Sequence, residues 1–208
     1  LDNNILVLTA DVDGAEKWRD DLQAIVGRDK INYFPTWETH IYENTPVSRE
    51  ASALRIETAT QLSKGGKRII VAPASALLAP LIPPHALELS TLKLEVGQQH
   101  AIDKILSHLL ETGFDEVNAI DNVGQFSQRG GILDVYPNNV KHPFRIEFFD
   151  DEVDSIREFD VITQRSKEGC QTAIIPPARE LVECQPFYED YQQRVQSENQ
   201  FVQVFLLH

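Results

Sequence analysis

The feature that most constrains the fold is a regular alternation of apolar runs and helical patterns over the first 72 residues. Residues 4–10, 31–34 and 68–72 are short apolar runs with the length of strands, and the first and last are typical of buried strands. Residues 15–25 and 51–62 instead place apolar side chains at helical intervals. A strand–helix–strand–helix–strand order favours a parallel sheet. We therefore predict that the chain opens with a parallel α/β layer.

The two predicted helices carry signals for where they begin and end. The first ends at Gly27, and its single apolar stripe consists of Ala15, Trp18, Leu22 and Ile25. The second begins after Ser48, a suitable N-cap residue, and ends at Gly65-Gly66. Its apolar positions are Ala51, Leu54, Ala59 and Leu62.

A proline-rich stretch at residues 79–84 interrupts this pattern and is the predicted linker, with a domain boundary near Thr91. Beyond it, residues 92–96 alternate as a half-buried strand does, and residues 102–110 repeat at helical spacing. Residues 117–159 are typical of strands separated by turns. We predict three parts: an α/β domain at 1–90, an α+β domain on a small antiparallel sheet at 91–177, and a further segment at 178–208.

Composition narrows the class of function. The formal net charge of -13 opposes binding to a polyanion, so a protein partner fits better than nucleic acid. No run approaches the length needed to cross a bilayer, and we expect a cytoplasmic protein without membrane contact. The chain begins with Leu1 and contains no Met, so we expect it to be a piece of a longer protein. Cys170 and Cys184 are expected to be reduced thiols.

We find no motif for catalysis, for a cofactor or for a metal. The lysine after Gly65-Gly66 lacks the first glycine and the hydroxyl residue of a phosphate loop, and it follows a helix where a phosphate loop precedes one. The six histidines show no metal-binding spacing. We therefore predict no catalytic residue, no cofactor-binding residue and no metal ligand.

Two motifs point to a binding surface. In residues 129–137, paired glycines after Arg129 indicate a tight turn or a close backbone approach before a strand. In residues 144–152, strand alternation places Arg145 and Phe149 on the face opposite the core. An exposed aromatic beside arginines is typical of an interaction hot spot. The alternative is equally compatible with the pattern: Phe149 is buried, and both arginines only pair with nearby carboxylates.

The chain resembles the transcription-repair coupling factor (Mfd) family and, more distantly, UvrB, from residue 4 to about residue 180. Four motifs carry the resemblance: Phe34-Pro35-Thr36-Trp37-Glu38-Thr39 with Tyr42, Arg129-Gly130-Gly131-Ile132-Leu133-Asp134, Arg145-Ile146-Glu147-Phe148-Phe149-Asp150-Asp151-Glu152, and Thr163-Gln164-Arg165-Ser166. Residues 35–46 are too few to hold the long DNA-inserting hairpin of UvrB, which favours the Mfd family.

The resemblance implies a degenerate helicase-like layer (1–90), an inserted domain that contacts UvrA (91–177) and the start of a return segment (178–208). It places Arg129, Arg145 and Phe149 on the surface that faces UvrA. We expect these three to be exposed, so that replacing each by alanine weakens UvrA binding and leaves the fold intact. ATP, magnesium, DNA and RNA polymerase are expected to bind other parts of the full-length protein. The alternative function is a truncated UvrB-type ATPase fragment of excision repair.

Overall fold

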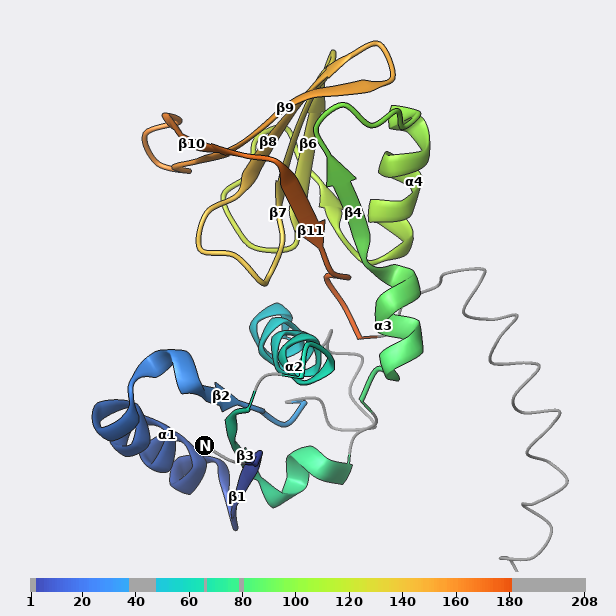
Figure 1. Ribbon diagram of the computed structural model, residues 1–208. Helices are drawn as coiled ribbons and strands as arrows, with labels where there is room; N and C mark the ends of the chain where they lie inside the picture. The colour runs from blue at the N-terminus through green and yellow to red at the C-terminus, as the bar shows by residue number, and fades with distance from the viewer. Residues whose placement is uncertain (1–2, 38–47, 66, 79–80, 181–208) are drawn as a thin grey trace, which may run out of the picture.

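The computed structural model describes residues 3–37, 48–65, 67–78 and 81–180, and these form a mixed α/β structure with three sheets. The predicted α/β class is confirmed at this level. Figure 1 shows the N-terminal helices and strands gathered in one part of the molecule and the larger sheet in another.

A small parallel sheet forms the N-terminal part. Its strands are β1 (Ile5–Thr9), β2 (Ile31–Tyr33) and β3 (Ile69–Pro73), and the central β3 is parallel to both neighbours, as predicted. Its helices are α1 (Val12–Val26), α2 (Arg49–Ser63) and two short 3-10 helices, η1 (Arg28–Lys30) and η2 (Ala74–Leu78). Ser48 caps α2, since its Oγ accepts a hydrogen bond from the backbone N–H of Ala51.

Two predicted burial patterns in this part are wrong. β1 lies at the edge of the sheet, so it is not a buried strand. Its exposed large apolar side chains are Ile5, Leu6 and Leu8. In α1, Ala15 is buried, but Trp18 and Ile25 are exposed. At about 100° per residue, the packed side chains Ala15, Leu22 and Val26 lie within roughly 40° of one another, whereas the two exposed side chains lie roughly 60° to 80° from Ala15.

A short helix that the sequence pattern did not predict, α3 (Pro84–Ser90), begins at the last residue of the predicted linker. Residues 79–80 lie outside the described residues, but Ile82 is buried directly before the helix. Together with Ala86 and Leu87 of α3, it packs against Ile56 and Ala59 of α2. This stretch is therefore packed against the N-terminal part, and the division of the chain near Thr91 stays a prediction.

A six-stranded sheet dominates the second part, in the order β10-β9-β8-β7-β6-β5. Its strands are β5 (Asp115–Glu116), β6 (Gln125–Arg129), β7 (Ile132–Tyr136), β8 (Phe144–Phe149), β9 (Glu152–Phe159) and β10 (Ser166–Cys170). From β6 to β10 they form an antiparallel meander, as predicted, whereas β5 pairs parallel to β6. Two further strands, β4 (Leu92–Glu95) and β11 (Thr172–Ile175), pair with each other in a separate antiparallel ribbon.

One face of this sheet packs against α4 (Ile102–Glu111) and the β4–β11 ribbon. The core residues come from all of these elements: Leu94, Ile105, Leu109, Phe126, Leu133, Val135, Phe144, Ile146, Val153, Ile156, Ala173 and Ile175. Because strand side chains alternate between faces, Arg145 and Glu147 of β8 lie on the opposite face from Phe144 and Ile146. That opposite face, called the open face below, is the one on which the sequence predicted a binding surface.

A buried ion pair joins α2 to the segment that follows β11. Arg55 is fully buried and the Glu180 side chain is 3% exposed, and Arg55 Nε donates to Glu180 Oε2 at 2.7 Å. The indole Nε1 of Trp37 donates to the same oxygen at 2.6 Å. Arg55 Nη1 donates to the backbone carbonyls of Pro35 and Ala76 at 3.0 and 3.2 Å. These contacts connect residues that lie 125 positions apart in the sequence.

We predict that Arg55→Ala destabilises the protein strongly. The substitution leaves the Glu180 carboxylate buried without its cation, and breaking a buried pair in this way costs about 3–5 kcal/mol of unfolding free energy. Urea denaturation followed by circular dichroism measures the loss. The matched control is Lys93→Gln, which removes an exposed pair with Glu95 and is expected to change the unfolding free energy by about 1 kcal/mol or less. Equal losses for the two variants would contradict the prediction.

Candidate protein-binding surface

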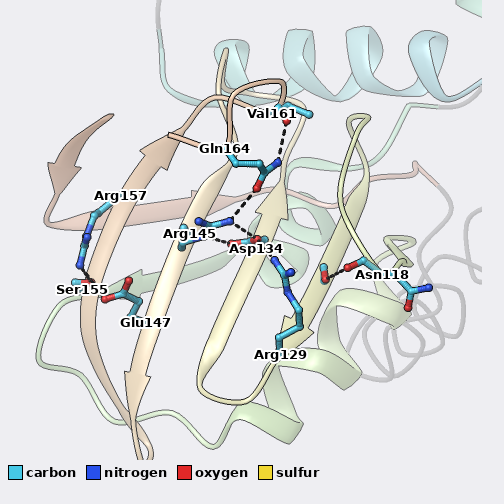
Figure 2. Close-up of polar contacts among 10 residues, drawn as sticks. Asn118, Arg129, Asp134, Arg145, Glu147, Ser155, Arg157, Val161 and Gln164 are labelled. Carbon is cyan, nitrogen blue, oxygen red and sulfur yellow. Dashed lines mark hydrogen bonds and ion pairs between the residues drawn. The ribbon is translucent and has the colours of Figure 1, made fainter. Parts of the chain in front are cut away.

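The open face of the six-stranded sheet carries a network of polar side chains centred on Asp134 (Figure 2). Asp134 lies on β7, where Leu133 and Val135 on either side of it point into the core. Across the sheet it is paired with Ser127 of β6 and Arg145 of β8. Its side chain is only 3% exposed, so the carboxylate requires close partners.

Arg145 is the main partner of this carboxylate. Its Nε donates to Oδ1 of Asp134 at 2.7 Å and its Nη2 donates to Oδ2 at 2.8 Å, which is the forked geometry of a strong arginine–carboxylate pair. The guanidinium lies over the ring of Phe159, 4.4 Å from its centroid, and the side chain is 18% exposed. The side-chain hydrogen bond to Asp134 raises the pKa of Arg145 further above its ordinary value, and the negative charges of Asp134 and Glu147 add to this against partial burial. Arg145 is therefore a charged and firmly held residue.

Arg129 and Phe149 are far more exposed. The Arg129 side chain is 60% exposed, and its Nη2 donates a hydrogen bond to Oδ2 of Asp134 at 3.3 Å. Phe149, at the end of β8, is 75% exposed. Ile132 lies between them in register, opposite Glu147 of β8 and Arg129 of β6, and it is exposed as well. Arg129, Ile132 and Phe149 together are called the docking surface below.

Around Asp134 two guanidinium groups face one carboxylate, whereas the exposed Glu152 of β9 lies opposite Phe149. Arg145 balances Asp134 through two hydrogen bonds. Farther across the open face, Glu147 accepts hydrogen bonds from Arg157 at 2.8 Å and from Ser155 at 2.9 Å, so this pair is neutral too (Figure 2). Arg129 therefore presents a positive charge beside apolar groups in a chain whose net charge is -13.

The turn between β6 and β7 brings this surface together. Gly130 has a φ of 59°, a conformation that favours glycine. At Gly131 a Cβ atom would lie 2.7 Å from the backbone oxygen of Phe148, and the Gly131 oxygen accepts a hydrogen bond from the Phe148 N–H at 2.7 Å. The predicted close backbone approach at these glycines is confirmed. It holds the start of β7 next to the end of β8, where Phe149 follows.

Comparison with known proteins shows which family the sheet that carries this surface resembles. Residues 92–181 match the family model described as the UvrB interaction domain. The matched part is called the UvrB interaction domain below, after that family. Over 178 residues, or 86% of the chain, the sequence is 35% identical to the transcription-repair-coupling factor of Bacillus subtilis (strain 168). Over the same length it is 32% identical to that of Staphylococcus aureus (strain USA300). The resemblance predicted from the four motifs is confirmed, and the chain spans about 15% of the length of these relatives.

The structure places all three predicted site residues on the open face of the UvrB interaction domain, and their role in binding stays a prediction. Phe149 is exposed, as expected. The expectation that Arg145 is exposed is wrong, because it is packed on Phe159 and paired with Asp134. Asp134 and Gln164 are not among the predicted site residues, although both lie in motifs that carry the resemblance. Strand alternation was the available signal, since it places Asp134 on the same face as Ile132.

The remaining sequence predictions concern metal ligands, the turn at Gly65-Gly66 and membrane contact. Among the described residues, no group of three or more His, Cys, Asp or Glu side chains is arranged to hold a metal ion. Gly65 follows α2 and precedes β3, which is the context predicted for a turn, while Gly66 lies outside the described residues, as do Cys184, His40 and His208. None of the described helices has the length and apolar character needed to cross a membrane.

We predict that the two arginines paired with Asp134 differ in their effect on stability. Arg145→Ala leaves the buried Asp134 carboxylate with only the 3.3 Å contact from Arg129, so about 3 kcal/mol of unfolding free energy is lost. Arg129→Ala removes an exposed side chain and changes stability by about 0.5 kcal/mol or less. Chemical denaturation of both variants measures the difference. Similar stabilities would show that the forked pair contributes little.

A second prediction concerns the turn that shapes the docking surface. Gly131→Ala forces a methyl group against the Phe148 backbone oxygen, and such overpacking typically destabilises by about 1–3 kcal/mol. Gly169→Ala in β10 is the matched control, because its added Cβ meets only an ordinary contact of 3.7 Å with the Ile156 oxygen. Thermal melting should show a lower midpoint for the first variant alone. A midpoint for Gly131→Ala as high as that of the control would refute the close approach.

Proposed function

We propose that this chain is a protein-binding module that recruits UvrA in transcription-coupled nucleotide excision repair, and that it carries out no catalysis itself. The observation that supports this most directly is the exposed Phe149 ring on the same open face of the UvrB interaction domain as the exposed Arg129. The names of the relatives support the repair context.

The physical argument rests on what this surface offers a partner. Aromatic and arginine side chains are enriched among the few residues that dominate binding energy at interfaces. Phe149 and Ile132 supply apolar area that water covers in the unbound protein, and Arg129 supplies an exposed cation for a carboxylate of the partner. All three are mounted at or beside strand ends of a packed sheet, so little backbone ordering is required on binding.

We also propose how the activities are distributed within a longer protein. Residues 1–90 form a degenerate helicase-like layer, 91–177 form the UvrA-binding domain, and 178–208 begin a return segment. ATP and magnesium binding, DNA translocation and contact with RNA polymerase belong to parts outside this chain. The net charge of -13 supports this, because it opposes the attraction to phosphates from which most non-specific DNA affinity comes.

The test is the affinity of alanine variants for UvrA. Phe149→Ala and Arg129→Ala are each expected to weaken binding by roughly thirtyfold, the equivalent of about 2 kcal/mol at an interface hot spot. Their melting temperatures should stay close to that of the unsubstituted protein, because both side chains are exposed. Titration of purified UvrA against each variant, followed by calorimetry, measures both the affinity and the heat of binding.

Trp18→Ala is the matched control, since Trp18 is also an exposed aromatic residue but lies on α1 in the N-terminal part. It should bind UvrA as tightly as the unsubstituted protein. Unchanged affinity for both Phe149→Ala and Arg129→Ala would defeat the proposal. An equal loss of UvrA affinity for Trp18→Ala would show that the binding site is not confined to the docking surface.

A further inference from the structure

The two arginines that share Asp134 differ in how much of each side chain a partner reaches. Arg145 is 18% exposed, while Arg129 is 60% exposed. Three groups already engage the Arg145 guanidinium: the Asp134 carboxylate, the Phe159 ring and the Gln164 side chain, whose Oε1 accepts from Nη2 at 3.2 Å. Among the described residues, the Arg129 side chain forms one hydrogen bond, which is to the same carboxylate.

A loop holds the Arg145 end of this network in place (Figure 2). Gln164 adopts a φ of 57°, and its Nε2 donates to the backbone oxygen of Val161 at 2.8 Å. Oδ1 of Asp160 accepts hydrogen bonds from the backbone N–H groups of Ile162 and Thr163 at 3.1 and 2.8 Å. The loop between β9 and β10 is therefore tied to itself, and it presents Gln164 to Arg145.

We propose that Asp134 and Arg145 are positioning residues: they hold Arg129 in the orientation in which it meets the partner, and neither of them touches the partner. This inference rests on the proposed function. The Arg145 fork fixes the Asp134 carboxylate, and the fixed carboxylate then accepts from Arg129. The partner surface that fits is a carboxylate set beside an apolar pocket for Phe149.

The advantage of such positioning is entropic. Arginine has many rotamers, and ordering a side chain of this kind on binding weakens affinity by about two- to tenfold. A carboxylate that already restrains Arg129 in the unbound protein reduces that loss. Removing the Asp134–Arg145 pair should therefore weaken UvrA binding by about this factor, and only while Arg129 is present.

A mutant cycle tests this. The paired replacement Asp134→Leu with Arg145→Met removes both charges together, which avoids leaving a lone buried charge. UvrA affinity is measured for this pair in the unsubstituted chain, in Arg129→Ala and in Phe149→Ala. We expect a two- to tenfold loss in the unsubstituted chain and in Phe149→Ala, and less than about twofold in Arg129→Ala, because effects at coupled sites are not additive. Phe149 lies four residues along β8 from Arg145, roughly 13 Å away, where additivity is expected.

Three results would overturn the inference. A full loss in the Arg129→Ala background would mean that Arg145 contacts UvrA directly. Equal coupling to Phe149 would mean that the pair has only a structural role. No loss in the unsubstituted chain would mean that Arg129 needs no positioning.

If the paired replacement does not fold, Arg145→Lys serves under the same criteria, because lysine keeps the charge but lacks the fork. The proposed function fails separately, namely when Phe149→Ala and Arg129→Ala themselves leave UvrA binding unchanged. If both weaken binding and the cycle is additive, only the positioning role is lost.

Discussion

The buried guanidinium of Arg55 is the contact on which the arrangement of the chain most depends. It forms an ion pair with Glu180, donates to two backbone carbonyls and lies 4.1 Å from the centroid of the Phe34 ring. A charge in such surroundings is stable only while all of these partners stay in place. The pair therefore fixes where α2 lies relative to the chain that leaves β11. Close by, Arg49 and Arg179 both reach Asp115 and link the same parts of the molecule.

The same pairing chemistry recurs at Asp134 with a different result. At Arg55 the cation is fully enclosed, and the pair serves the fold. At Asp134 a nearly buried carboxylate holds Arg145 against the sheet, where it is 18% exposed, whereas Arg129 stays 60% exposed. That difference follows from position: Arg55 lies on the packed face of a helix, and Asp134 lies on the side of a sheet that the core does not cover. A structural ion pair is thereby placed next to a surface with the composition of an interface.

The architecture of the UvrB interaction domain explains why the docking surface is available. An antiparallel sheet buries one face and leaves the other to polar side chains. Here the covered face is filled by α4 and the β4–β11 ribbon, so each strand of the meander presents alternate residues outward. The tight turn at Gly130 and Gly131 then sets three strand ends side by side, and this geometry exposes Phe149 while its neighbour Phe148 packs on the core.

The sequence by itself determined the local structure: the parallel strands, the Ser48 cap, the antiparallel meander and the glycine turn. These depend on periodicity and backbone preferences within a few residues. Tertiary structure alone decided that β1 is an edge strand, that Trp18 and Phe149 are exposed, that Arg55 is enclosed and that Arg145 is half-buried. Burial of such residues depends on which distant segment packs against them, as Glu180 packs against Arg55 from 125 positions away. The local sequence pattern cannot predict that neighbour.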